Sequence, residues 1–314
     1  MMKTTLQKGD MILFFAGDTW LSKSISYLTD AEVTHASMVY SEDSIVEILA
    51  DGIQVNKIAL ATNEQEGQKA YLMRHVPELD FEPLKKSADA YLESGVSYDF
   101  PGLYLLGILL IYNKFVPTPQ FLHGTELILE AGIYLLDHFI QKHIKHNSGK
   151  AAVCSQMIYQ IFYDCGGDYR IPIVDGCLSV KKNADDCRPG EVRLIDLINE
   201  DCMPVEKNTV SLPSDTETIN PPSPDSIENA TRELYLALTQ ATLMESLNTN
   251  SLFSKSGNMD KVLSLTRQYL DRIKLLQEKL HSDLPLDAMF VTVGDLAYHA
   301  PSLQRVDTIF VKRL

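Results

Sequence analysis

Two short apolar segments separated by a polar break, VTHASMVY at 33–40 and SIVEIL at 44–49, constrain the fold more than any other feature of the sequence. Their Val, Ile and Tyr content and the intervening SED predict an antiparallel β-hairpin. The hairpin carries two titratable side chains, His35 and Glu47. Glu47 has apolar neighbours on both faces of its strand, where an ionised carboxylate is costly unless a cation or a hydrogen-bond donor meets it. Glu47 therefore needs a partner.

The register of the hairpin indicates which partner is available. If SED forms a three-residue loop, Tyr40 pairs with Ser44 and Glu47 lies opposite Ser37. Glu47 then shares a face with His35, one diagonal step away and within reach of a side-chain contact. A two-residue loop would reverse the parity and separate the two side chains. With the three-residue loop, we expect Glu47 to hold the imidazole of His35.

A third residue with suitable chemistry is Cys154, in the stretch SGKAAVCSQMIYQIFYDCGG at 148–167. Its apolar spacing predicts a helix that begins near Cys154 and ends at the glycine pair 166–167. A helix N-terminus and a neighbouring imidazolium both lower the pKa of a thiol, and the thiolate is the nucleophile. A cysteine that opens an apolar helix is by itself more often a small buried residue. Together with His35 and Glu47, it forms a set of nucleophile, base and orienting acid.

Composition and charge exclude several other classes of protein. The net charge of -14, with no Lys/Arg-rich tract, argues against a nucleic-acid partner. The N-terminus has no pattern of a secretory signal peptide. The longest apolar run, 102–112, has about half of the ~20 residues that a membrane-spanning helix requires. We therefore expect a cytoplasmic protein where it is made, with secretion by a route independent of signal peptides as the alternative.

The sequence predicts neither a metal nor another cofactor. The 5 cysteines form no CxxC pair, and in a protein without a leader we expect reduced thiols. Three histidines follow one another at His138, His143 and His146 without an acidic or cysteine partner at metal-ligand spacing.

The pattern along the chain predicts an α+β fold. Residues 9–80 are β-rich, with helices predicted at 18–30 and 83–94. Two further amphipathic helices are predicted at 226–247 and 258–281, the second with the apolar spacing of an ordinary packed helix.

Changes in composition predict three regions. Residues 1–204 form a catalytic domain, 205–284 a linker followed by a helical insertion, and 285–314 a return to the catalytic domain. Within the first region, 101–146 contains two long apolar helical stretches. A helical hairpin packed on the core is the ordinary interpretation, and an apolar lid or acyl-chain groove is the alternative.

The motifs KGDMILFFAGDTWLSKSISYLT, THASMVY, VEILADGIQV, YDF and VCSQMIYQIF together resemble the YiiX/YebB-like family. These are cysteine hydrolases of the circularly permuted papain-like, NlpC-type superfamily. The resemblance covers about 8–60 and 95–165, together with the closing VTVGDLAYHAPSLQRV, and leaves out 101–146 and 205–284.

The order of the three residues agrees with this resemblance. His35, Glu47 and Cys154 follow one another as in the permuted superfamily, where the histidine strand precedes the nucleophile helix. The lecithin–retinol acyltransferase branch has a similar layout but typically carries a second histidine where this chain has Glu47.

The resemblance implies a permuted papain-like fold, with an antiparallel β-barrel or sheet packed against the nucleophile helix. It also implies further site residues. Tyr98 resembles the family's active-site tyrosine and would donate its hydroxyl to the oxyanion, with a packing role as the alternative. Asp18 and Trp20 are candidates for lining the cleft. The backbone N–H of Cys154 is a natural oxyanion donor.

We therefore predict a thiol-dependent hydrolase that cleaves an amide, ester or thioester bond through an acyl-enzyme, with acyl transfer as an alternative outcome. Its substrate would be a small molecule, a peptide or an acylated compound. The apolar stretch 101–146 favours a lipid or acylated substrate and peripheral contact with lipid. Two other functions stay open: a cell-wall peptide amidase or endopeptidase delivered as a secreted effector, and an inactive papain-like scaffold. The sequence does not predict the oligomeric state.

Overall fold

The computed structural model describes part of the chain. The described residues are 5–98, 103, 106–110, 122, 125–126, 129–130, 132–134, 136–137, 151–178, 257–279 and 290–314. They form a mixed α+β fold, which confirms the predicted α+β class.

Contacts divide the chain into two compact units. One comprises 1–110, 146–187 and 282–314, and the other comprises 111–145 and 188–281. These boundaries differ from the predicted ones, because 111–145 and 188–204 belong to the second unit rather than to the catalytic domain. The closing residues lie in the first unit, which holds all three residues of the predicted triad.

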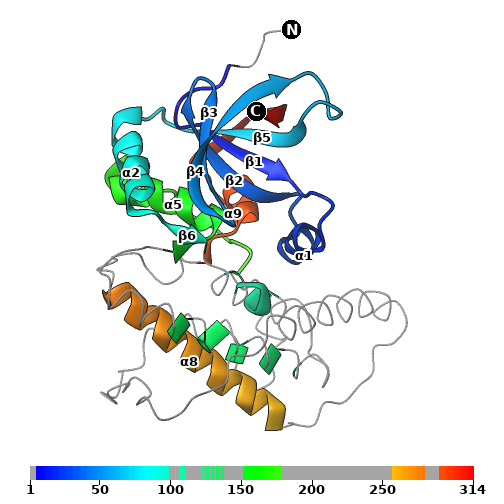
Figure 1. The fold of residues 1–314 in the computed structure, drawn as a ribbon, viewed down its shortest axis with the longest axis vertical. Coiled ribbons are helices and arrows are strands. Elements are labelled where there is room, and N and C mark those ends of the chain that lie inside the picture. Colours follow the sequence, from blue (N-terminus) through cyan, green and yellow to red (C-terminus); the bar gives the residue numbers. More distant parts are fainter. Residues whose placement is uncertain are drawn as a thin grey trace. The chain divides into compact units, whose positions relative to one another are not determined.

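The first unit is built on six antiparallel strands that close into a barrel (Figure 1). Around the barrel the order is β1, β2, β3, β4, β8 and β5, and β5 pairs with β1. The strands are β1 (Met11–Phe15), β2 (Val33–Ser41), β3 (Ser44–Leu49), β4 (Gly52–Ala61), β5 (Gln68–His75) and β8 (Leu303–Arg313). Because β8 pairs with both β4 and β5, the closing segment of the chain completes the barrel.

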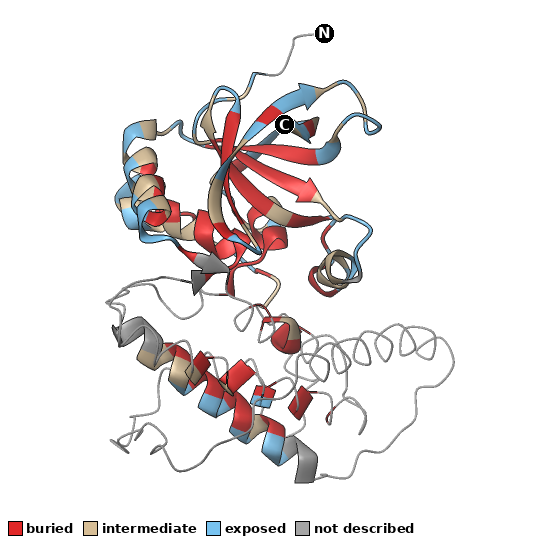
Figure 2. Cartoon of the chain, viewed as in Figure 1, coloured by how far each residue is buried: buried red, intermediate tan, exposed pale blue. Residues whose placement is uncertain are grey.

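Alternating side chains give the barrel two apolar surfaces, and buried residues run along its strands (Figure 2). The inner surface consists of residues from the strands alone: Ile12, Phe14, Val39, Ile45, Ile58, Ala70, Leu72, Ile309 and Val311. The outer surface packs against helices. Ala36, Met38, Val46 and Ile48 of the hairpin share this second cluster with α5.

The helices of the barrel unit include α1 (Trp20–Thr29), α2 (Phe81–Ser94), α5 (Cys154–Cys165) and α9 (Val293–Tyr298). The unit also contains the short strands β6 (Ser97–Tyr98) and β7 (Ala151–Ala152) and a 3-10 turn at Gly167–Tyr169. Helices α5 and α9 both contact β2. The hydroxyl of Ser155 donates to the Val291 carbonyl at 2.7 Å, which ties the first turn of α5 to the segment before α9.

The predicted hairpin forms, but its turn differs from the predicted one. Ser41 pairs with Ser44 rather than Tyr40, so the loop has two residues. A register shift between Val39 and Ser41 compensates for the shorter loop, and Met38 lies opposite Val46. Because this bulge restores the parity, the predicted face-sharing of the two titratable side chains survives the error in the turn.

In the second unit, the predicted helix at 258–281 is present as α8 (Gly257–Lys279). Val262, Tyr269 and Ile273 are buried, as its apolar spacing predicts. The helix also makes charged contacts with the described residues of 111–145: Arg272 pairs with Asp137 at 2.7 Å, and Lys261 pairs with Glu126 and Glu130 at 3.0 and 2.9 Å.

The described residues of the apolar stretch 101–146 are helical. Its buried members are Leu103, Leu106, Ile108, Leu109, Leu110, Leu122, Leu129, Ile133 and Leu136. Packing therefore accounts for these side chains. The rest of this stretch, the 205–256 segment and the predicted helix at 226–247 lie outside the described residues. No helix in the described part of the chain combines the length and apolarity needed to cross a bilayer.

Candidate active site

Cys154 is the first residue of α5, as predicted from the sequence. The preceding Val153 has extended backbone angles (φ -87°, ψ 166°) and supplies no side-chain cap. The backbone N–H of Val153 donates to Oε1 of Gln156 at 3.2 Å, so Gln156 reaches back over the start of the helix. The α-helical pattern leaves the first N–H groups without intrahelical partners, and one of them, the N–H of Ser155, acts on the thiol.

The predicted contact between the base and the acid is present. Nε2 of His35 lies 2.6 Å from Oε2 of Glu47. The side chain of Glu47 is completely buried, whereas 20% of the side chain of His35 is exposed. The imidazole therefore has one edge against a buried acid while another part of the ring is accessible.

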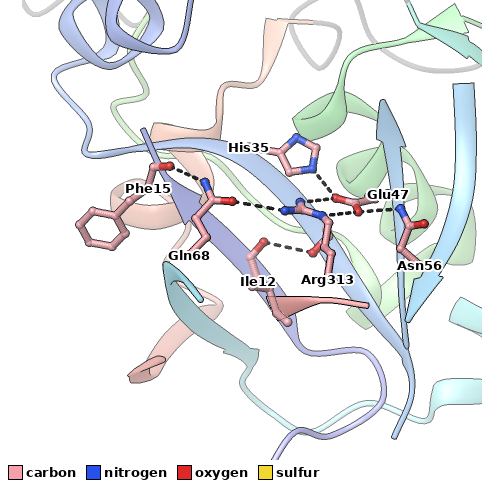
Figure 3. Close-up of polar contacts among 8 residues, drawn as sticks. Ile12, Phe15, His35, Glu47, Asn56, Gln68 and Arg313 are labelled. Carbon is pink, nitrogen blue, oxygen red and sulfur yellow. Dashed lines mark hydrogen bonds and ion pairs between the residues drawn. The ribbon is translucent and has the colours of Figure 1, made fainter. Parts of the chain in front are cut away.

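Glu47 satisfies its charge through a polar network at one end of the barrel interior (Figure 3). Besides His35, Asn56 donates from Nδ2 to Oε1 at 2.9 Å. Arg313 donates to both carboxylate oxygens, from Nε to Oε1 at 2.9 Å and from Nη2 to Oε2 at 2.8 Å. Four donors thus occupy the four lone-pair positions of the carboxylate. Glu47 is therefore equipped to orient the imidazole rather than to accept a proton from substrate.

The opposite side of the imidazole faces the thiol. The side chain of Cys154 lies close enough to His35 for each group to shift the pKa of the other. Because Nε2 of His35 is bonded to Glu47, Nδ1 is the ring nitrogen left for Cys154. The backbone N–H groups of Ala36 and Ser155 also act on the sulfur. The predicted triad therefore comes together from β2, β3 and α5.

Each residue of the triad has partners that stabilise its charged form. Burial disfavours the charged form of each group, but specific partners outweigh burial in all three. The pKa of Cys154 is lowered by the hydrogen bond and charge of His35 and by the two backbone N–H groups. The pKa of His35 is raised to about 9 by Cys154 and Glu47. The pKa of Glu47 is held well below its usual range by Arg313 and His35. The arrangement favours a thiolate–imidazolium pair.

The sequence pattern did not reveal Arg313 and Asn56, which contact the carboxylate of Glu47, or Gln68, which contacts Arg313. One signal could have found Arg313: it alternates with Ile309 and Val311, so it shares the apolar inner face of its strand. A cation on such a face needs an anion, just as Glu47 needs a cation.

The other predicted site residues are less fully placed. Tyr98 pairs through its backbone with Ala152, two residues before Cys154. Its side chain, like that of Trp20 at the start of α1, lies outside the described residues. Asp18 is fully exposed and forms an ion pair with Lys23 at 3.5 Å. Its described contact is thus at the surface and does not involve the triad.

A second group of chemically active side chains consists of Cys177, Asp295 and His299, whose ligand atoms lie within 4.8 Å of one another. Both oxygens of Asp295 already accept hydrogen bonds. Oδ1 accepts from the Cys177 N–H at 2.6 Å, and Oδ2 accepts from the N–H and hydroxyl of Thr292, both at 2.8 Å. Asp295 therefore serves to fasten the 171–178 segment to the start of α9.

In comparisons with known proteins, no family model matches the chain and no curated sequence matches it.

Proposed function

We propose that the protein is a cysteine hydrolase with a permuted papain-like catalytic domain, similar to the YiiX/YebB-like family. Cys154 is the nucleophile, His35 the general base and acid, and Glu47 the orienting acid. The bond that is cleaved is an amide, an ester or a thioester.

One observation carries the proposal. The imidazole of His35 is bonded to the buried Glu47 at 2.6 Å and is near enough to the thiol of Cys154 for the two groups to shift each other's pKa. Each residue alone has an ordinary structural explanation. Their alignment at a helix N-terminus, with the sulfur shielded and the pKa of Cys154 lowered, matches the requirements of nucleophilic catalysis.

The reaction follows from this geometry. The thiolate of Cys154 attacks the carbonyl carbon, and the resulting oxyanion is stabilised by N–H groups at the start of α5, including that of Cys154 itself. The imidazolium of His35 gives its Nδ1 proton to the leaving amine, alcohol or thiol. Water then enters, His35 removes its proton, and the hydroxide attacks the thioester and releases the acid. Glu47 keeps the ring oriented through both steps.

One feature of the sequence bears on the class of substrate. The apolar sequence of 101–146 favours a lipid or acylated substrate. Because its described apolar side chains are buried, this preference rests on the sequence pattern alone. Peptide and acyl substrates therefore belong in the same assay.

The test is hydrolysis of a matched panel: p-nitrophenyl esters of two to sixteen carbons, acyl thioesters and peptidyl amides. Wild-type protein should turn over at least one class, and C154A should not. A covalent acyl adduct should be trapped on the peptide that contains Cys154 and be seen as a mass increase. Equal turnover by wild type and C154A would contradict the proposal.

A further inference from the structure

Arg313 has an unusual position for an arginine, because its charge is directed into the barrel interior. Its guanidinium makes two parallel hydrogen bonds to the carboxylate of Glu47, at 2.9 and 2.8 Å. This paired arrangement is the strongest geometry available between the two groups. Glu47 is fully buried and 33% of the Arg313 side chain is exposed, so the pair is only partly hydrated.

Other contacts hold the guanidinium in place (Figure 3). Nη1 of Arg313 donates to Oε1 of Gln68 at 3.2 Å, and Nε2 of Gln68 donates to the Phe15 carbonyl at 3.0 Å. The guanidinium carbon of Arg313 lies 4.4 Å from the centre of the Phe14 ring. The same ring lies 5.7 Å from the ring of His35. Phe14 thus packs beside both the cation and the base.

The charged groups around the triad come from four elements. His35 (β2) and Arg313 (β8) face Glu47 (β3), and Cys154 (α5) faces His35. Among the described residues, Arg313 is the permanent cation in direct contact with this group. Without a cation, a buried carboxylate takes up a proton. A neutral Glu47 would no longer stabilise the imidazolium of His35.

We infer that Arg313 is a positioning residue of the active site, which keeps Glu47 ionised and oriented and thereby keeps the imidazole of His35 charged beside Cys154. Arg313 acts through Glu47 and does not itself contact the nucleophile. The inference rests on the proposed function, because it assigns a role in preparing the same thiol for reaction.

The experiment is a double-mutant cycle with R313Q, E47Q and the double variant. The readout is the rate of Cys154 alkylation by iodoacetamide against pH, measured for each cysteine-containing peptide by mass spectrometry. In R313Q, the pH at which the alkylation rate of Cys154 begins to fall on the acid side (the acid limb) should be about one unit higher than in wild type. At pH values below this limb, alkylation should be about tenfold slower. In the E47Q background, R313Q should cause no further shift, because the group through which Arg313 acts is already neutral.

Two further variants separate charge from geometry. K312Q removes one positive charge from the neighbouring, exposed position of β8 and should leave the limb unchanged. R313K keeps the cation but loses the parallel pair of hydrogen bonds, so its limb should move in the same direction as in R313Q by a smaller amount. Thermal unfolding of each variant shows whether the fold is retained. If R313Q does not fold, the limb position in R313K is by itself the test of the inference.

An unmoved limb in R313Q and R313K would overturn the inference. The inference would also be overturned if R313Q shifted the limb equally in wild type and in E47Q. Arg313 would then act on Cys154 as a distant charge and not through Glu47. The readout needs no substrate. A protein that shows the predicted limb shifts but hydrolyses nothing would therefore contradict the proposed function alone, whereas active variants with unmoved limbs would contradict only the role of Arg313.

Discussion

The two ends of α5 each carry a thiol, but the electrostatic surroundings of the two thiols differ. Cys154 opens the helix and Cys165 closes it, and neither forms a disulfide. Burial by itself would raise the pKa of both thiols. For Cys154, the imidazole of His35 and two backbone N–H groups reverse this effect. For Cys165, burial and the neighbouring Asp164 raise the pKa to about 11.

The comparison shows that neither burial nor membership of a helix selects the nucleophile. At the helix N-terminus, backbone N–H groups and the positive end of the dipole favour an anion. At the C-terminus, carbonyl groups face the sulfur, and Cys165 donates its S–H to the Ile161 carbonyl at 3.2 Å. Cys177 behaves like Cys165, because burial and Asp295 raise its pKa to about 12. For Cys154, by contrast, the imidazole of His35 lowers the pKa.

The largest expected difference between the two ends is in turnover. C154A should lose at least about 10⁴-fold in kcat/KM, because the covalent step is no longer available. C165A should stay within twofold of wild type. Steady-state kinetics on the best substrate of the panel measures both. Equal losses in the two variants would show that the ends of the helix are not distinguished by catalysis.

Removing the imidazole of His35 should make the reactivity of Cys154 resemble that of Cys165. H35N should lower kcat by about 10³-fold, within the range for loss of general acid–base catalysis. The alkylation profile of Cys154 in H35N should shift toward higher pH, toward that of Cys165 in the same protein. If Cys154 kept its wild-type profile in H35N, the helix N-terminus alone would be responsible for its reactivity.

The acid that supports the imidazole should also stabilise the fold. E47Q leaves Arg313 facing a neutral amide in a buried site, so we expect a loss of about 3 kcal/mol in the free energy of unfolding at pH 7. The folded-state pKa of Glu47 lies below its unfolded value. Its stabilisation is therefore complete above about pH 5 and declines as the pH falls through the folded pKa.

Urea unfolding of wild type and E47Q at several pH values measures this contribution. The difference between the two proteins should shrink as the pH is lowered from 7 toward 3, because the unfolded chain takes up a proton on Glu47 in this range while the folded protein does not. A difference that stays constant over this range would mean that ionisation of Glu47 contributes nothing to stability.

The smallest expected effect is on the alkaline limb of activity. The pKa of His35 is raised to about 9, so the imidazolium persists below that pH and is lost above it. The pH profile of kcat/KM should therefore fall near pH 9, and E47Q should move this limb down by about one unit because one source of stabilisation is removed. An alkaline limb in E47Q at the wild-type position would contradict the role of Glu47.

Local rules are enough to predict the contact between His35 and Glu47 and the position of Cys154 at the start of α5. Parity along a strand places His35 and Glu47 on one face, and helix spacing places Cys154 at the start of α5. The turn was predicted wrongly, since Ser41 rather than Tyr40 pairs with Ser44. A β-bulge is an insertion whose position depends on packing, so it is difficult to derive from a short polar loop.

The partners of the acid could not be predicted in the same way. Arg313 is 266 residues from Glu47 along the chain, and its contact exists only because β8 closes the barrel. Local patterns show that Glu47 requires a cation, but the closure of the sheet determines which cation meets it. Residues 111–145 are likewise grouped with 188–281, far along the chain, which local patterns do not indicate.

The most direct test of the central claim is the ultraviolet absorbance of the thiolate near 240 nm, titrated in wild type and C154A. The difference between the two proteins should show a thiolate already present at pH 7 and a transition below the usual cysteine value of about 8.5. A difference spectrum that stays flat until about pH 9 would mean that the thiol of Cys154 is neutral at physiological pH, and the thiolate–imidazolium pair would not exist.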